Sequence, residues 1–171
     1  MSKLVLIEGG VTFPWKTLED LPAWFSAALT RLGTPLPSFE AYTQRLKAAP
    51  FLGPYWNAYF DLYFQHDVRQ QSDGSVVAKC YREGTMEEFN RYAEGAAEAQ
   101  WAQVQVPTLL LRAGQGLVSD HDQLMTAEAA AAQQSIAGSR LVNFPTLNHF
   151  TIGFGVEPGP VEVIRAFLEE P

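Results

Sequence analysis

The chain has 171 residues, 47% of them hydrophobic, which is enough for one globular domain with a sizeable core. Nineteen acidic and twelve basic side chains give a net charge of -7, which opposes binding to a phosphate backbone and excludes nucleic acid as an expected partner. Cys80 is the only cysteine and the three histidines are scattered, so no disulfide and no metal site are expected.

Neither a membrane segment nor a cofactor motif is found. The first apolar run stops at Glu8, too early for a signal-peptide core or a bilayer span, so a cytoplasmic protein without a membrane partner is expected. The glycines of residues 114–116 fit neither a P-loop nor a dinucleotide-binding pattern. The sequence therefore implies no cofactor.

Three short apolar runs, at about 3–8, 107–113 and 140–144, are each followed by a turn and predict β-strands. The helical segments between them are typical of a parallel sheet, and therefore of an α/β fold. In such sheets the reactive groups lie at the carboxyl ends of the strands. Glu8 and His149 are expected at that edge.

Residues 11–105 are expected to form a mostly helical insertion. The apolar spacing predicts one helix that ends at Gly33, a second that is capped by Ser38, and a third that begins near Pro54. The third helix carries a broad aromatic stripe. Such a stripe is typical of a protein core but can also line an apolar ligand pocket, and the two roles are compatible.

Capping patterns predict further helices. After an extended run at residues 75–81, Thr85 and Glu88 form a capping-box pattern. Ser119 is expected to cap a helix through Gln134, and a terminal helix is expected after Pro160.

Two motifs together resemble the C-terminal half of an α/β-hydrolase. They are PTLLLRAG at 107–114 and NHFTIGF at 148–154, and the order of elements agrees over essentially the whole chain. The resemblance is to members that are similar to haloalkane dehalogenases and epoxide hydrolases. The resemblance implies that residues 1–10 and 106–171 belong to the hydrolase core and that residues 11–105 form a helical cap, or lid.

The family's nucleophile elbow, G-x-S-x-G, does not occur in these 171 residues. The resemblance places that elbow upstream of the first strand, in an N-terminal half that the chain lacks. Without a nucleophile and an oxyanion site, a histidine and an acid retain little of the rate enhancement. The chain alone is therefore not expected to be a competent hydrolase.

The resemblance identifies His149 as the catalytic histidine, which an acid must hold in one tautomer. The commonest family pattern has an Asp where this chain has Gly116. Asp120 follows, but it also fits the start of a capped helix. The dehalogenase-like branch takes its acid from the end of the earlier strand, where Glu8 stands, and we favour Glu8 over Asp120.

Several aromatic residues follow Glu8 closely in the sequence and could form a lid over a substrate site. A second interpretation is that they only pack the cap against the sheet. They are Phe13, Trp15, Trp24 and Phe25.

The leading hypothesis is a C-terminal hydrolase half that supplies histidine, acid and cap. It would act on a small apolar ester, epoxide or carbon–halogen substrate if another chain supplies the nucleophile. The alternative is a catalytically inactive truncated remnant or a binding module. In either case the first strand would be an unpaired edge, so we expect self-association or pairing with a separate N-terminal half.

Overall fold

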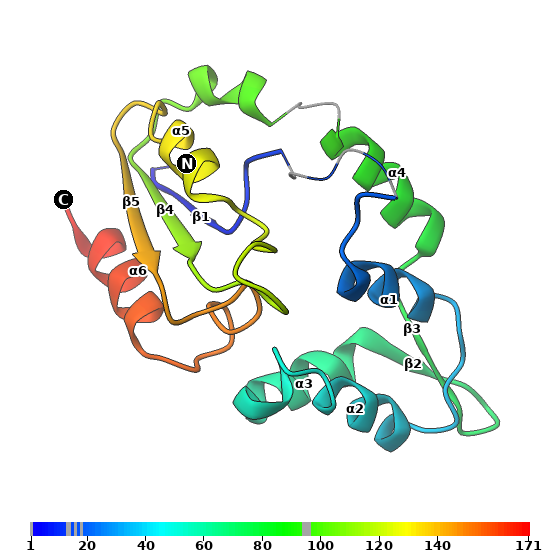
Figure 1. Ribbon diagram of the computed structural model, residues 1–171. Coiled ribbons are helices and arrows are strands. Elements are labelled where there is room, and N and C mark those ends of the chain that lie inside the picture. Colours follow the sequence, from blue (N-terminus) through cyan, green and yellow to red (C-terminus); the bar gives the residue numbers. More distant parts are fainter. Residues whose placement is uncertain (1, 13–14, 16, 18, 94–96) are drawn as a thin grey trace. The chain divides into compact units, whose positions relative to one another are not determined.

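The computed structural model describes residues 2–12, 15, 17, 19–93 and 97–171. The chain forms two compact units (Figure 1). The first combines Met1–Lys16 with Arg91–Pro171, and the second is Thr17–Asn90. These bounds differ from the expected core and cap segments because residues on both sides of the insertion, among them Thr12 and Trp101, bond within the first unit.

The first unit contains a three-stranded parallel sheet in the order β1 (Leu4–Ile7), β4 (Thr108–Ala113), β5 (Ser139–Phe144). Leu4 lies beside Thr108 in the register, and Thr108 lies beside Ser139. All three strands therefore end at the same edge (Figure 1). The predicted α/β class and the three predicted strands are confirmed.

The central strand β4 is buried along its whole length, which explains its nearly uninterrupted apolar sequence. Leu109, Leu111 and Ala113 pack in one core cluster with Phe167 of the terminal helix α6 (Gly159–Glu169). Side chains alternate along a strand, so Arg112 lies on the opposite face. There its guanidinium Nε donates to the carbonyl of Met125, 3.0 Å away.

Two helices were expected in this unit and one of them is much shorter than predicted. The terminal helix after Pro160 is confirmed, since α6 begins at Gly159. The helix expected from Ser119 to Gln134 is wrong: α5 spans only Ala127–Gln133 and is capped by the Thr126 side chain. The preceding residues form turns because the Asp122 carboxylate accepts their backbone N–H groups. The short 3₁₀ helix η2 (Glu98–Gln103) was not predicted.

The second unit is mostly helical. Its elements, in chain order, are α1 (Ala23–Arg31), α2 (Phe39–Lys47), η1 (Gly53–Tyr55), α3 (Ala58–Asp67), β2 (Val68–Gln70), β3 (Val76–Ala78) and α4 (Arg82–Ala93). The predicted Ser38 cap is confirmed, because its side chain accepts the N–H of Ala41.

Two helix starts in this unit differ from the sequence prediction. Pro54 lies in η1, and α3 begins after Asn57, whose side chain accepts two backbone N–H groups. The capping box at Thr85 is wrong, since α4 begins at Arg82 and the Thr85 N–H is already bonded to the carbonyl of Tyr81. The local capping patterns therefore misplaced the starts of α3 and α4, which hydrogen bonds of neighbouring residues decide.

The aromatic stripe of α3 divides between interior and surface. Phe60 is fully buried and Phe64 nearly so, and both stack on the Trp56 ring. Tyr59 and Tyr63 are 64% and 50% exposed. Only part of the stripe is therefore core.

Candidate active site

Glu8 directly follows β1 and has a backbone conformation that is unusual for its residue type. Its N–H donates to the carbonyl of Leu111, which continues the pairing with β4, and its φ is 51°. Among the described residues it is the one non-glycine with positive φ. Such a backbone costs about 1–3 kcal/mol and persists only where the surroundings hold it. The two glycines after Glu8 let the chain turn away from the sheet at once.

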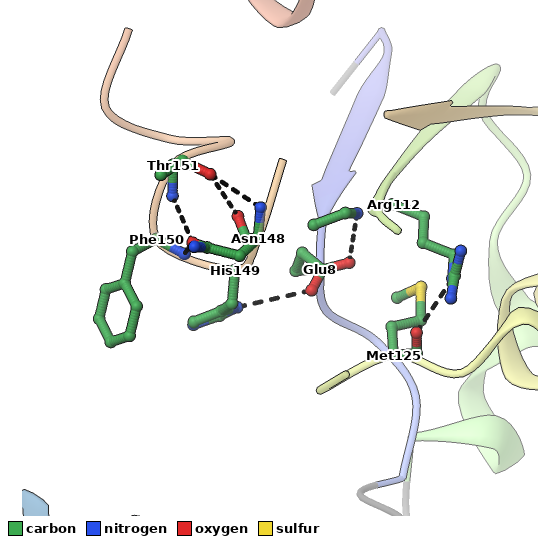
Figure 2. Close-up of polar contacts among 8 residues, drawn as sticks. Glu8, Arg112, Met125, Asn148, His149, Phe150 and Thr151 are labelled. Carbon is green, nitrogen blue, oxygen red and sulfur yellow. Dashed lines mark hydrogen bonds and ion pairs between the residues drawn. The ribbon is translucent and has the colours of Figure 1, made fainter. Parts of the chain in front are cut away.

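The Glu8 carboxylate is buried between the sheet and the loop that follows β5. Its side chain is 2% exposed. Oε1 accepts the backbone N–H of Ala113 at 2.7 Å, and Oε2 lies 3.7 Å from Nδ1 of His149 (Figure 2). One carboxylate oxygen is thus bound to the end of β4, and the other faces the imidazole.

The loop residue His149 is held by the residues on either side of it. Oδ1 of the buried Asn148 accepts the N–H groups of Phe150 and Thr151, each at 3.0 Å. The Thr151 hydroxyl in turn accepts the N–H of Asn148 at 2.8 Å (Figure 2). This reciprocal cap closes a tight turn around His149, in the same way as a helix capping box.

The His149 ring has one buried nitrogen and one accessible side. Its side chain is 35% exposed, while Nδ1 is buried and makes no hydrogen bond. The gap of 3.7 Å to Glu8 is slightly longer than a hydrogen bond. A small shift of the loop closes it, and catalytic hydrogen bonds are often long without substrate. Such a carboxylate can hold the imidazole so that Nε2 is free to transfer protons.

The acids after β4 have a different environment. Asp120 is exposed, and no ion pair joins its carboxylate to His149. Asp122 is buried, and its carboxylate accepts the N–H groups of Leu117, Val118 and Ser119. Of the two predicted acids, the structure therefore brings Glu8 and not Asp120 to the histidine.

Gly116, where the resemblance places an Asp, has no room for a side chain. A Cβ on Gly116 would lie 1.8 Å from the carbonyl oxygen of Ser119 and 2.3 Å from Oδ1 of Asp122. No side chain fits there while the loop is closed. The space that a carboxylate at 116 would need is occupied by the turn that Asp122 stabilises.

Two parts of this site were not predicted from the sequence: the Ala113 N–H and the cap formed by Asn148 and Thr151. The backbone N–H of Ala113 carries no side-chain signal and depends on the register of β1 and β4. Asn148 and Thr151 did leave a signal, the N-x-x-T spacing around His149, which is typical of a local cap.

The predicted substrate-binding aromatics are distributed over the two units. Phe13 lies outside the described residues. Trp15 belongs to the first unit and is half-buried. Trp24 and Phe25 lie in α1 of the second unit, with ring centroids 5.4 Å apart, and Trp24 also contacts Phe51 at 6.4 Å. Their part in a substrate site remains a prediction.

The described part of the chain contains neither a cluster suited to a metal ion nor a helix suited to a bilayer. Within residues 2–12, 15, 17, 19–93 and 97–171, His, Cys, Asp and Glu side chains do not gather in groups of three or more that could hold a metal ion. In the same part of the chain, no helix combines the length and the apolar character needed to cross a bilayer.

Several solved structures superpose on this chain. E-2-(acetamidomethylene)succinate hydrolase superposes with a TM-score of 0.72 at 17% identity, over 99% of this chain and 58% of its own. The chain has part of the α/β-hydrolase fold. The peroxisomal α/β-hydrolase Lpx1 of Saccharomyces cerevisiae gives 0.65 at 12% identity, over 100% of this chain and 49% of that one. An esterase of M. tuberculosis gives a TM-score of 0.59 at 18% identity, over 85% of this chain and 46% of that one.

The likeness to α/β-hydrolases is one of structure. The chain spans about half the length of these hydrolases. No protein-family model matches its sequence, and no curated protein matches it significantly.

Proposed function

We propose that this chain supplies the proton-relay half of a hydrolase active site, with His149 as general base and acid and Glu8 as its carboxylate partner. The observation that carries the proposal is the pair itself. Oε2 of a buried carboxylate faces Nδ1 of a partly exposed imidazole at 3.7 Å, at the carboxyl edge of a parallel sheet. That edge is where α/β folds hold their reactive groups.

The chemistry follows from the two nitrogens of the ring. With Glu8 at Nδ1, the imidazole presents Nε2 to a nucleophile or to a water molecule. With an ester, His149 takes a proton from the attacking hydroxyl or water and returns it to the leaving alkoxide, while Glu8 stabilises the imidazolium that forms between these steps. With a carbon–halogen bond the halide leaves as an anion, and His149 acts only as the base that takes a proton from the attacking water. In our proposal the attacking atom comes from residues outside these 171.

The fold and the position of the acid support a proposed reaction class. We infer hydrolysis of an ester, an epoxide or a carbon–halogen bond in a small apolar substrate. Trp15, in the same unit as His149, is a proposed apolar contact, since an aromatic wall with few polar groups suits such a substrate. A role of Trp24 and Phe25 in substrate binding stays a prediction from the sequence. Asp120 is the alternative acid if Glu8 proves dispensable.

Complementation tests the proposal. The chain is mixed with, or joined to, a polypeptide that carries the nucleophile-bearing strands of an α/β-hydrolase, and p-nitrophenyl ester hydrolysis is measured. We expect activity above that of either part. His149→Gln should lower it by about 10²–10⁴-fold, the usual contribution of general acid–base catalysis. His121→Gln is the matched control, because His121 is exposed in the turn after β4.

Equal activity of the two histidine variants contradicts the assignment of His149. No gain over the separate parts, with both parts folded, favours the alternative that the chain is an inactive truncated remnant or a binding module.

We also propose that β1 pairs with a further strand. Among the described residues β1 pairs with β4 alone, and Ile7 is 43% exposed. Its sequence LVLI has no charge, proline or bulge that would protect an edge. The occupant is a strand of the nucleophile-bearing half or, without it, a second copy of this chain. Sedimentation should detect self-association at tens of micromolar, and a strictly monomeric profile contradicts the proposal.

A further inference from the structure

The turn that follows Glu8 is held by two side chains from distant parts of the chain. Nε2 of Gln133, in α5, donates to the carbonyl of Gly9 at 3.0 Å. Nε1 of Trp101, in η2, donates to the carbonyl of Gly10 at 2.7 Å. We call Gln133 and Trp101 the carbonyl clamp. Two consecutive carbonyls directly after Glu8 are thus fixed by side-chain donors.

Both clamp residues are themselves tightly held. Gln133 is fully buried; its Nε2 is bonded to the carbonyl of Gly9, and its Oε1 has no hydrogen-bond partner. Trp101 packs against the core cluster of Val11, Met125 and Ala130. Neither clamp residue is an exposed side chain.

The backbone of the turn is shaped to fit the clamp. Gly10 has φ +81°, and a Cβ there would lie 2.7 Å from Nε2 of Gln133. Further along, the N–H of Thr12 donates to Oε1 of Glu98 at 2.6 Å, so η2 anchors the segment a second time. Position 10 requires a glycine because of its positive φ and because a Cβ would clash with Gln133.

The clamp acts on Glu8 through the backbone. A residue at φ 51° relaxes to negative φ unless its neighbours prevent it, and that rotation would swing the Glu8 side chain away from Ala113 and His149. We propose that Gln133 and Trp101 are positioning residues that keep the Glu8 carboxylate aimed at His149. The proposal rests on the proposed function for its consequence in catalysis, but the geometry can be tested without activity.

The test uses the whole chain and NMR. Gln133→Met and Trp101→Phe each remove one donor and keep most of the packing. Gln134→Met, one residue along at an exposed position, is the matched control. Two signals report on Glu8: the exchange protection of the Ala113 amide, which donates to Oε1, and the strong intraresidue NOE between amide and Hα that accompanies positive φ. The Leu110 amide, central in β4, reports on the sheet.

We expect each clamp variant to lower Ala113 protection about tenfold or more, the equivalent of a hydrogen bond to a charged group. The Glu8 NOE should weaken, while Leu110 protection and the Gln134→Met spectrum stay unchanged. Wild-type protection of Ala113 and a strong Glu8 NOE in both variants overturn the proposal. If Gln133→Met unfolds the chain, the milder Trp101→Phe decides.

The catalytic consequence is measured separately, in the complemented hydrolase. The clamp variants should lower kcat with KM unchanged, because they change the orientation of Glu8 and leave substrate contacts intact. Displaced Glu8 signals with no activity in any sample would refute the proposed function and leave the clamp standing. Unchanged Glu8 signals in an active hydrolase refute the clamp alone.

Discussion

Substitution of Gly116 tests whether the loop after β4 leaves room for a side chain at this position. In Gly116→Ala the new methyl group would lie 1.8 Å from the Ser119 carbonyl oxygen and 2.3 Å from Oδ1 of Asp122. Both atoms must move, and the Asp122 carboxylate then loses N–H donors from residues 117–119. Losing one or two such hydrogen bonds to a charged group costs about 3 kcal/mol. Gly116→Ala should therefore lower the free energy of unfolding by about that amount.

Two other glycines separate the possible causes. Gly138 has φ +72° and open space around it, so Gly138→Ala should cost only the left-handed strain, about 1–2 kcal/mol. At Gly153 the nearest atom lies 3.9 Å from a new Cβ, so Gly153→Ala should change stability by about 0.5 kcal/mol or less. Urea unfolding of the three variants gives the order of their stabilities. Equal stabilities of Gly116→Ala and Gly153→Ala would refute the steric argument, whereas the expected order supports it.

Three further predictions concern stability and the site. Leu109→Ala should cost about 2–5 kcal/mol in urea unfolding, because Leu109 is fully buried in the central strand; a cost below about 1 kcal/mol contradicts that burial. Asn148→Ala should raise exchange at the amides of Phe150 and Thr151 and lower kcat of the complemented hydrolase, and unchanged exchange refutes the cap. Burial and the bond to Asp67 raise the pKa of Tyr42 above its usual value, so folding keeps a proton that unfolding releases and stability falls above about pH 10. Unfolding at about pH 9 and about pH 11 should show a smaller loss in Tyr42→Phe, and equal losses refute that assignment.

Local patterns in the sequence predict the sheet and part of the site. The three apolar runs predict the strands because a strand buried on both faces must be apolar along its length, and β4 is such a strand. Their order in the chain places Glu8 and His149 at one edge, since parallel strands end together. The terminal helix and the Ser38 cap are also predicted correctly from local signals.

The sequence left the choice of acid open and predicted one helix start wrongly. Long-range contacts and backbone contacts decide both points. Glu8 and Asp120 are both acids after strand ends, and only the fold places one of them 3.7 Å from the imidazole. The helix expected from Ser119 fails because Asp122 turns back onto three backbone N–H groups, which competes with a helix start.

The sequence by itself therefore determined the secondary structures that periodicity and capping encode, and the identity of the candidate histidine. Tertiary structure alone decided which carboxylate meets that histidine and how it is aimed. The physical reason is that the aim of Glu8 depends on a strained backbone, on the Ala113 N–H and on donors from Gln133 and Trp101. The Ala113 N–H and the two side-chain donors lie more than ninety residues from Glu8 or its turn, so no local sequence pattern can record these contacts.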